Sequence, residues 1–420
     1  MSHERNCPSS WPVGALCCPA GSTCLFVRIN CMPVSDFDVL IVGGGLAGLS
    51  LACALRDTRL RVALVERQPP RPADGWDARV YAISPANSRF LQDIGIWKHL
   101  PGERLGAISA MKIHGDGGAE LDFSAYEAGV DALGWVLESS VMACELWENA
   151  KRQGNLTLFC PAVPAAIEIG ARAASLTLGD DRRIAARLVV AADGRDSWVR
   201  DQVGLRAIDT PYGELGLVAN FACQLPHRGV ARQWFRHDGV LAWLPLAGDR
   251  ISIVWSTPEE HARQLLGLAA DTLASRVAAA GDSALGAFTP LTPAAAFPLR
   301  LLQVPQTVAP RVALVGDAAH GIHPLSGHGI NLGFQDARAL ASLLATLAEW
   351  QDVGNLRFLR RYQRQRREET LLMQTTTHAL HHLFGTGVPG LRTLRNAGMK
   401  LTNALPVLKQ LLVQYAIGAF

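Results

Sequence analysis

The chain has 420 residues, of which 49% are hydrophobic and 18% are charged, and its formal net charge is +3. This length and composition are typical of a globular protein with a large core, and they predict two domains. The small net charge gives no indication of nucleic-acid binding, and no stretch approaches the 18 consecutive apolar residues of a membrane-spanning helix.

The first 31 residues differ in composition from the rest of the chain. They contain Pro, Ser and Gly without a helical pattern, and they lack the continuous apolar core and cleavage site of a signal peptide. We expect residues 1–36 to be a disordered extension or the result of a start placed upstream of Met32, with a metal-binding tail as the alternative. The four cysteines that follow this extension lack metal-ligand spacing and are expected to be buried thiols in a reducing compartment: Cys53, Cys144, Cys160 and Cys223.

The most specific pattern begins with residues 39–42, an apolar β-branched run that predicts a buried parallel strand. A GxGxxG motif follows. Gly43 permits a tight turn, Gly45 lets the backbone approach a pyrophosphate, and Gly48 lets a helix at about residues 46–56 pack closely on the strand. The N-terminal amides of that helix are expected to face the phosphates.

A second predicted strand, residues 60–66, places Glu66 where a carboxylate can accept hydrogen bonds from a ribose diol. Residues 385–390 also fit GxGxxG, but they follow no strand pattern and Pro389 interrupts them, so we expect a loop there. The sequence therefore predicts one dinucleotide-binding fold, not two.

Two further fragments follow apolar strands. Asp193 comes after residues 186–192, and Asp317 comes after residues 311–315, where its carboxylate could bind a ribityl hydroxyl. Each aspartate could equally be a turn residue or a helix cap, but three fragments in this order predict an FAD site. The third fragment continues into a glycine-rich stretch that could place backbone N–H groups beside the flavin ring, with a helix starting near its last member: Pro324, Gly327 and Gly329.

Alternating apolar patterns in residues 104–185 and 206–300 predict a mostly antiparallel sheet inserted between the FAD fragments. The expected fold class is α/β, a Rossmann-type FAD-binding domain with a mostly antiparallel-sheet substrate domain. The FAD-binding domain would comprise residues 37–103, 134–160, 186–205 and 301–350, the substrate domain 104–133, 161–185 and 206–300, and a C-terminal helical region 351–420.

The C-terminal region contains two helical patterns. The leucines from Leu401 to Leu412 predict a helix packed on the body, with a membrane-surface or partner-docking helix as the alternative. A basic run is expected to form a solvated helix face, with contact to an acidic membrane surface as the alternative: Arg357, Arg360, Arg361, Arg364, Arg366 and Arg367.

Several stretches together resemble the group A flavoprotein monooxygenases, and most closely the ubiquinone-biosynthesis hydroxylase family. The resemblance covers almost the whole chain from Phe37, and its most specific parts are Asp77-x-Arg79 and Gly316-Asp-Ala-Ala-His320. It implies FAD, NADH or NADPH, dioxygen, and hydroxylation of a polyprenylated phenol ring through a flavin C4a-hydroperoxide. The fold would then be aromatic hydroxylase-like.

The resemblance also implies roles for individual residues. Arg79 would lie near the pyrophosphate and the ring edge, while Asp193 and Arg195 belong to a stretch that also serves NAD(P)H in the wider class. His328 stands where the family usually has Gln, which puts the hydroxylated ring position in doubt. No catalytic base is identified, although His320, His323 and His328 are candidates by position. The remaining implied cofactor contacts are Gly43, Gly45, Gly48, Glu66, Asp317, Pro324, Gly327 and Gly329.

Two other functions share these FAD fragments, namely a flavin-dependent reductase or dehydrogenase and a non-catalytic FAD-binding subunit of a biosynthetic complex. The expected partner is a polyprenylated phenol or quinone intermediate, with no nucleic acid. We expect a cytoplasmic protein, with a peripheral position at the inner membrane face or in a biosynthetic complex as a further expectation.

Overall fold

The computed structural model describes residues 35–322 and 329–385, together with 396, 399, 401–403 and 405. The predictions made for residues 1–34, for the loop at 323–328 and for most of the last helix lie outside the described residues. Of the second GxGxxG motif only Gly385 is described, and it ends a helix rather than following a strand.

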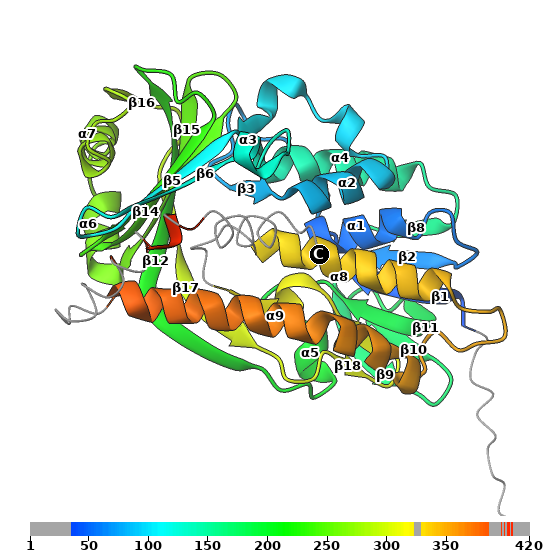
Figure 1. The fold of residues 1–420 in the computed structure, drawn as a ribbon. Helices are drawn as coiled ribbons and strands as arrows, with labels where there is room; N and C mark the ends of the chain where they lie inside the picture. Colours follow the sequence, from blue (N-terminus) through cyan, green and yellow to red (C-terminus); the bar gives the residue numbers. More distant parts are fainter. Residues whose placement is uncertain are drawn as a thin grey trace, which may run out of the picture. The chain divides into compact units, whose positions relative to one another are not determined.

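A mainly parallel sheet carries the predicted nucleotide-binding motif (Figure 1). The first strand, β1 (Phe37–Val42), pairs in parallel with a strand on each side, β2 (Val62–Val65) and β11 (Arg183–Ala191). The sheet runs in the order β18-β19-β11-β1-β2-β8. Its other members are β8 (Leu156–Phe159), β18 (Val308–Ala309) and β19 (Val312–Leu314).

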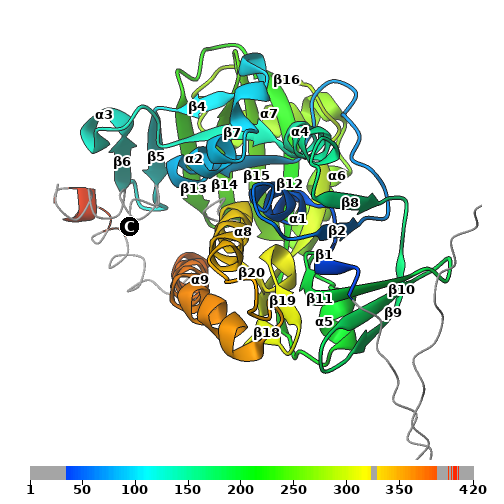
Figure 2. The same ribbon diagram turned by 90° about the vertical axis from the view of Figure 1, so that its right-hand side faces the viewer.

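Both faces of β1 are buried, which explains its uninterrupted apolar run. Val39 and Ile41 face a core made with helices, whereas Leu40 and Val42 face a second core that includes Leu176. Figure 2 shows α1 and α8 next to each other over the sheet. The helices of the first core are α1 (Leu46–Ala54), α2 (Pro85–Asp93), α4 (Ser139–Lys151), α8 (Gly329–Ala345) and α9 (Leu356–Gly385).

One predicted boundary is wrong, because residues 161–185 belong to this sheet and not to the substrate domain. They form β9 (Pro164–Ile169) and β10 (Ala174–Leu178), and β10 pairs antiparallel with β11. The short turn between β10 and β11 favours a local hairpin. An alternating pattern reveals a half-buried strand, but it does not reveal which sheet the strand joins.

The second sheet is antiparallel except for one parallel pair, β5 with β13, as predicted for a mostly antiparallel sheet. Two short helices, α6 (Glu259–Leu266) and α7 (Ala270–Ala280), cover one of its faces (Figure 1). Its strands are β5 (Ala110–His114), β6 (Glu120–Ser124), β12 (Ile208–Cys223), β13 (Val230–Arg236), β14 (Gly239–Leu246), β15 (Arg250–Pro258), β16 (Phe288–Pro290), β17 (Ala295–Gln303) and β20 (His320–Gly321).

A three-stranded sheet, whose strands alternate in sequence with those of the two larger sheets, shares apolar contacts with β13 and β14. Residues 107–113, within the alternating pattern predicted for 104–185, form two strands separated at Ser109, of which the first enters this small sheet and the second is β5. The remaining elements are β3 (Val80–Ile83), β4 (Gly106–Ile108), β7 (Gly134–Glu138), α3 (Ala125–Ala128), α5 (Trp198–Gln202), and the 3-10 turns η1 (Trp97–His99), η2 (Gly102–Arg104) and η3 (Gly316–Ala318).

The basic run on α9 is a solvated face with one exception. Arg366 is only 7% exposed, so its predicted place on the solvated face is wrong. The helical period explains this, since Arg366 lies on the same face as the buried Leu359 and Tyr362. The five arginines that are exposed as predicted are Arg357, Arg360, Arg361, Arg364 and Arg367.

Arg366 is buried because it pairs with Asp336 of α8, which is 1% exposed. One Asp336 oxygen accepts the Arg366 Nε–H at 2.8 Å; the other accepts the Gly316 N–H at 2.9 Å and lies 2.6 Å from His320 Nε2. Burial favours the neutral acid, but His320 and Arg366 outweigh it and hold the pKa of Asp336 below its usual range. This carboxylate joins α8, α9 and the turn after β19.

We expect Asp336→Asn to lower the free energy of unfolding by about 3–5 kcal/mol, because it removes the buried counter-charge of Arg366 and leaves only the more exposed Glu369. Since the pKa of Asp336 is depressed in the folded state, the ionised carboxylate stabilises the fold above about pH 4 and this stabilisation is lost at lower pH. Chemical denaturation from pH 7 to pH 3 should therefore show a shallower loss of stability on acidification for the variant. The surface pair of Asp180 and Arg182 offers the control, and an equal effect of Asp180→Asn would contradict the assignment.

Candidate functional site

Four predicted site residues follow the carboxyl ends of neighbouring parallel strands. Gly43 follows β1, Glu66 follows β2, Asp193 follows β11, and Asp317 lies in η3 after β19. The order β19-β11-β1-β2 brings these strand ends to one edge of the sheet, where ligands of open α/β sheets bind.

Two glycines of the motif are required by the protein itself. Gly43 has a φ of +108°, and a Cβ there would lie 2.3 Å from the carbonyl oxygen of Ala192. A Cβ on Gly48 would lie 2.0 Å from the carbonyl oxygen of Gly43. These contacts press α1 against the turn, as the sequence predicts for close helix–strand packing.

Gly45 differs from both, because a Cβ at this position would meet no atom within 4 Å. It is the exposed N-cap of α1, with an ordinary φ of −72°. The fold therefore has no need of glycine here, whereas a ligand approaching the backbone would need it. The open space lies at the N-terminus of a helix, where amides and the helix dipole favour a phosphate, so the residues present fit the pyrophosphate of FAD.

Glu66 lies beside the glycine turn. One carboxylate oxygen accepts the Gly44 N–H at 2.5 Å, and the other accepts the Gln68 N–H at 3.0 Å. The half-buried side chain is thus held at the edge of the motif, and its contact with a ribose diol stays a prediction.

Asp193 has partners within the protein. Its carboxylate accepts hydrogen bonds from Ser197 Oγ at 2.5 Å and from the Val199 N–H at 3.0 Å, at the start of α5. Burial raises the pKa of Asp193, although these hydrogen bonds oppose the rise. Arg195 donates to the carbonyl oxygen of Arg300 at 3.0 Å. The structure shows a helix-cap role for Asp193, and a contact with FAD or NAD(P)H remains a prediction.

Arg79 and Asp317 both act on a tyrosine, Tyr81, that the sequence analysis did not single out. The exposed Arg79 guanidinium is 5.6 Å from the ring centroid of Tyr81 on β3. Burial raises the pKa of Tyr81, the Asp317 carboxylate raises it further, and Arg79 opposes both. Asp317 is itself exposed, and its contact with a ribityl hydroxyl stays a prediction.

The first turn of α8 is fixed by Asn331, a second residue that the sequence analysis did not identify. Its side-chain oxygen accepts the Ser84 N–H at 3.0 Å and Asn87 Nδ2 at 2.9 Å, and its Nδ2 donates to the Ala82 carbonyl oxygen at 2.7 Å. The signal for this role in the sequence is an amide side chain in the first turn of a mainly apolar helical run. Gly329 begins the helix as predicted, and a Cβ there would meet nothing within 4 Å.

The remaining predicted residues divide into two groups. His320 is described, and its Nε2 is engaged by the buried carboxylate of Asp336. The structure therefore gives His320 a polar structural role beside the buried Asp336. Pro324, Gly327, His323 and His328 lie outside the described residues.

Comparison with known proteins agrees with this geometry. The FAD-binding domain family matches residues 36–374. The chain is 34% identical to ubiquinone hydroxylase UbiL of Rhodospirillum rubrum, over 91% of this chain and 89% of that protein. It is 32% identical to 3-demethoxyubiquinol 3-hydroxylase of Escherichia coli, over 91% and 98%.

Among solved structures, P. aeruginosa PqsL in complex with 2-aminobenzoylacetate has a TM-score of 0.72 and 26% identity, over 86% of this chain and 99% of that one. These findings confirm the predicted fold class, the cofactor FAD and the monooxygenase resemblance. The chain therefore belongs to the FAD-dependent aromatic hydroxylases, the monooxygenase family to which its ubiquinone hydroxylase relatives belong.

Proposed function

We propose that this protein hydroxylates the aromatic ring of a polyprenylated phenol in ubiquinone biosynthesis, using NADH or NADPH and dioxygen. The observation that carries the proposal is the length of the similarity to two ubiquinone hydroxylases, which spans 91% of this chain and 89% and 98% of theirs. Such a match includes the second sheet as well as the FAD-binding motif, and the second sheet is where a fold of this kind holds its substrate.

Bound FAD supplies the hydride acceptor and the oxygen chemistry. The backbone at Gly45 and the N-terminus of α1 hold the negative pyrophosphate. Glu66 accepts hydrogen bonds from the adenosine ribose, and Asp317 accepts them from a ribityl hydroxyl. Arg79, which lies beside Tyr81, would be near the pyrophosphate and the edge of the flavin ring, where its positive charge complements the phosphates.

The protein must also exclude water from the reacting ring. Asn220 of β12 supports this role, because its Nδ2 donates to the backbone oxygen of Asp77 at 2.8 Å. The Asp77 carboxylate in turn accepts the N–H groups of Arg79 at 2.8 Å and Ser140 at 3.0 Å. These bonds connect the second sheet to the loop that carries Arg79.

A prenyl tail would bring the substrate from a membrane, and we propose a peripheral contact there. Over the part of the chain that the structure describes, no helix combines the length and hydropathy needed to cross a bilayer. The exposed face of α9 supports surface contact instead, since Leu371 and Leu372 follow its exposed arginines and are 51% and 50% exposed.

The hydroxylation itself is tested with purified holoenzyme, NADPH or NADH, and a polyprenylated phenol in detergent. We expect the phenol to accelerate both oxidation of the nicotinamide and oxygen consumption, and we expect one atom of ¹⁸O₂ in the product. Phenol-dependent oxidation without an oxygenated product would identify a reductase instead. Flavin binding without any turnover would identify a non-catalytic subunit.

Gly45→Val should abolish FAD binding and leave the fold intact, because its side chain would occupy the open space at the start of α1. Gly48→Ala is the contrasting variant, since its Cβ would collide with the Gly43 carbonyl and destabilise the apoprotein. Flavin absorbance per protein and the thermal midpoint of the apoprotein separate the two effects. Stoichiometric FAD in purified Gly45→Val would refute the phosphate assignment.

Asp317→Ala should weaken FAD binding by roughly 10- to 100-fold, the loss of one charge-assisted hydrogen bond of about 1.5–3 kcal/mol. The fold should be unaffected because Asp317 is exposed. Fluorescence titration of the apoprotein measures the affinity, and circular dichroism checks the fold. Asp271→Ala, on α7 of the other sheet, is the control. Unchanged affinity in Asp317→Ala would reduce Asp317 to a turn residue.

A further inference from the structure

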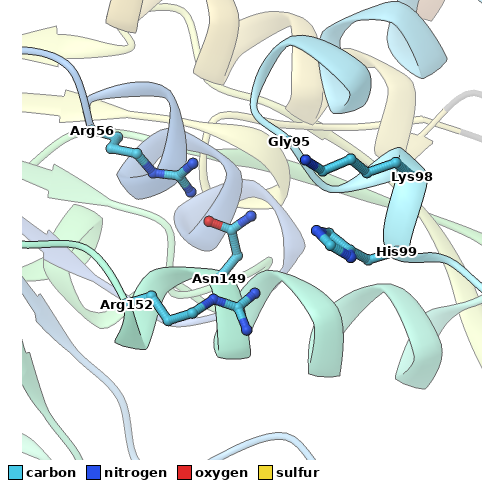
Figure 3. Close-up of a pocket in the computed structure, with 6 residues that line it drawn as sticks. All are labelled: Arg56, Gly95, Lys98, His99, Asn149 and Arg152. Carbon is cyan, nitrogen blue, oxygen red and sulfur yellow. The ribbon is translucent and has the colours of Figure 1, made fainter.

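A pocket lies at the C-terminal end of α1, whereas Gly45 lies at the N-terminal end of this helix (Figure 3). Its volume is about 360 Å³. Because α1 has nine residues, roughly 14 Å of helix separates this pocket from the phosphate-binding turn. Three segments contribute its lining, namely the chain after α1, the turn after α2 together with η1, and the end of α4: Arg56, Gly95, Lys98, His99, Asn149 and Arg152.

The lining has one sign of charge. Arg56, Lys98 and Arg152 are cations at neutral pH, and no carboxylate lines the pocket. The nearest recorded counter-charge is Glu145, whose carboxylate is 3.7 Å from Arg152. Figure 3 shows the side chains of Arg56, Asn149 and Arg152 extending toward the same space as His99. A concave surface lined in this way concentrates positive potential and attracts anions.

Two donors of this pocket are withdrawn from solvent. Arg56 Nη2 is buried and forms no hydrogen bond among the described residues, although the guanidinium lies near the Cys53 thiol and opposes the rise in its pKa that burial causes. Asn149 is 5% exposed, and its Nδ2 makes one long bond of 3.5 Å to the Ile94 carbonyl. A Cβ on Gly95 would lie 3.7 Å from both Arg56 Nη1 and Asn149 Nδ2, so the two donor groups converge over this glycine.

Helix capping explains only part of this arrangement. Basic side chains near the ends of α1 and α4 interact favourably with the helix dipoles, which accounts for Arg56 and Arg152. It does not account for a buried guanidinium nitrogen without a hydrogen bond, which is unfavourable. It also does not account for Lys98, which comes from a third segment. An anion in the pocket would supply an acceptor for Arg56 and Lys98, and it would add to the Glu145 carboxylate beside Arg152.

We propose that this pocket binds a phosphate group, separate from the pyrophosphate of FAD. Guanidinium groups bind phosphate through paired N–H donors, and Lys adds a point charge. The buried Asn149 amide supplies a neutral donor beside Arg56. The group could be carried by a free phosphate compound or by a lipid headgroup, since both present the same oxygens to these donors.

Inorganic phosphate is the probe, titrated calorimetrically into FAD-saturated holoenzyme at constant ionic strength. We expect one saturable site per chain and at least 10-fold weaker binding in Arg56→Gln. Arg364→Gln, an exposed arginine of α9, should stay within about twofold of the wild type. Absence of saturable binding, or equal weakening by Arg364→Gln, would overturn the proposal.

Two further measurements complete the test. If Arg56→Gln loses FAD or thermal stability, the double variant Lys98→Gln/Arg152→Gln replaces it, since both side chains are exposed and must weaken phosphate binding if the site exists. Vesicles of phosphatidylcholine with and without phosphatidic acid then distinguish the sources. Binding to phosphatidic acid that Arg56→Gln removes assigns the site to a headgroup; phosphate binding without it assigns the site to a free phosphate compound.

Discussion

The buried carboxylate of Asp336 is the interaction on which the geometry of the FAD site depends. A full negative charge at 1% exposure is stable only because Arg366, His320 and the Gly316 N–H surround it. These partners come from α9, β20 and the turn after β19. Asp317, which is exposed, directly follows Gly316 in the chain. The buried Asp336 carboxylate therefore helps to fix the position of the exposed Asp317 carboxylate.

The glycine motif at the same edge of the sheet contains glycines that are needed for different reasons. Gly43 and Gly48 are glycines because the chain contacts itself at 2.3 Å and 2.0 Å from where their Cβ atoms would lie. Gly45 is a glycine in open space, where only a ligand requires it. A glycine that the fold does not need is therefore stronger evidence for a binding site than one that packing explains.

Basic residues along α9 and at the end of α1 illustrate a related distinction between charge and site. The arginines along α9 are mostly solvated, and their number alone says little about binding. The pocket at the end of α1 differs because a donor nitrogen of Arg56 is buried and unpaired within the described residues. A candidate anion site differs from an ordinary helix end because its donor groups converge and are buried, not because it has many positive charges.

Short-range periodicity and backbone sterics were enough to predict the first strand, the glycine turn, the helix starting at Leu46 and the strand ends that carry Glu66, Asp193 and Asp317. The partners of these elements depended on the folded structure. Folding buried Arg366 beside Asp336, joined β10 to the parallel sheet, directed the Asp193 carboxylate to the first turn of α5, and brought the Arg79 guanidinium to 5.6 Å from the Tyr81 ring. Periodicity reports which face of an element is buried, whereas the partner that buries it is chosen by packing across the whole fold.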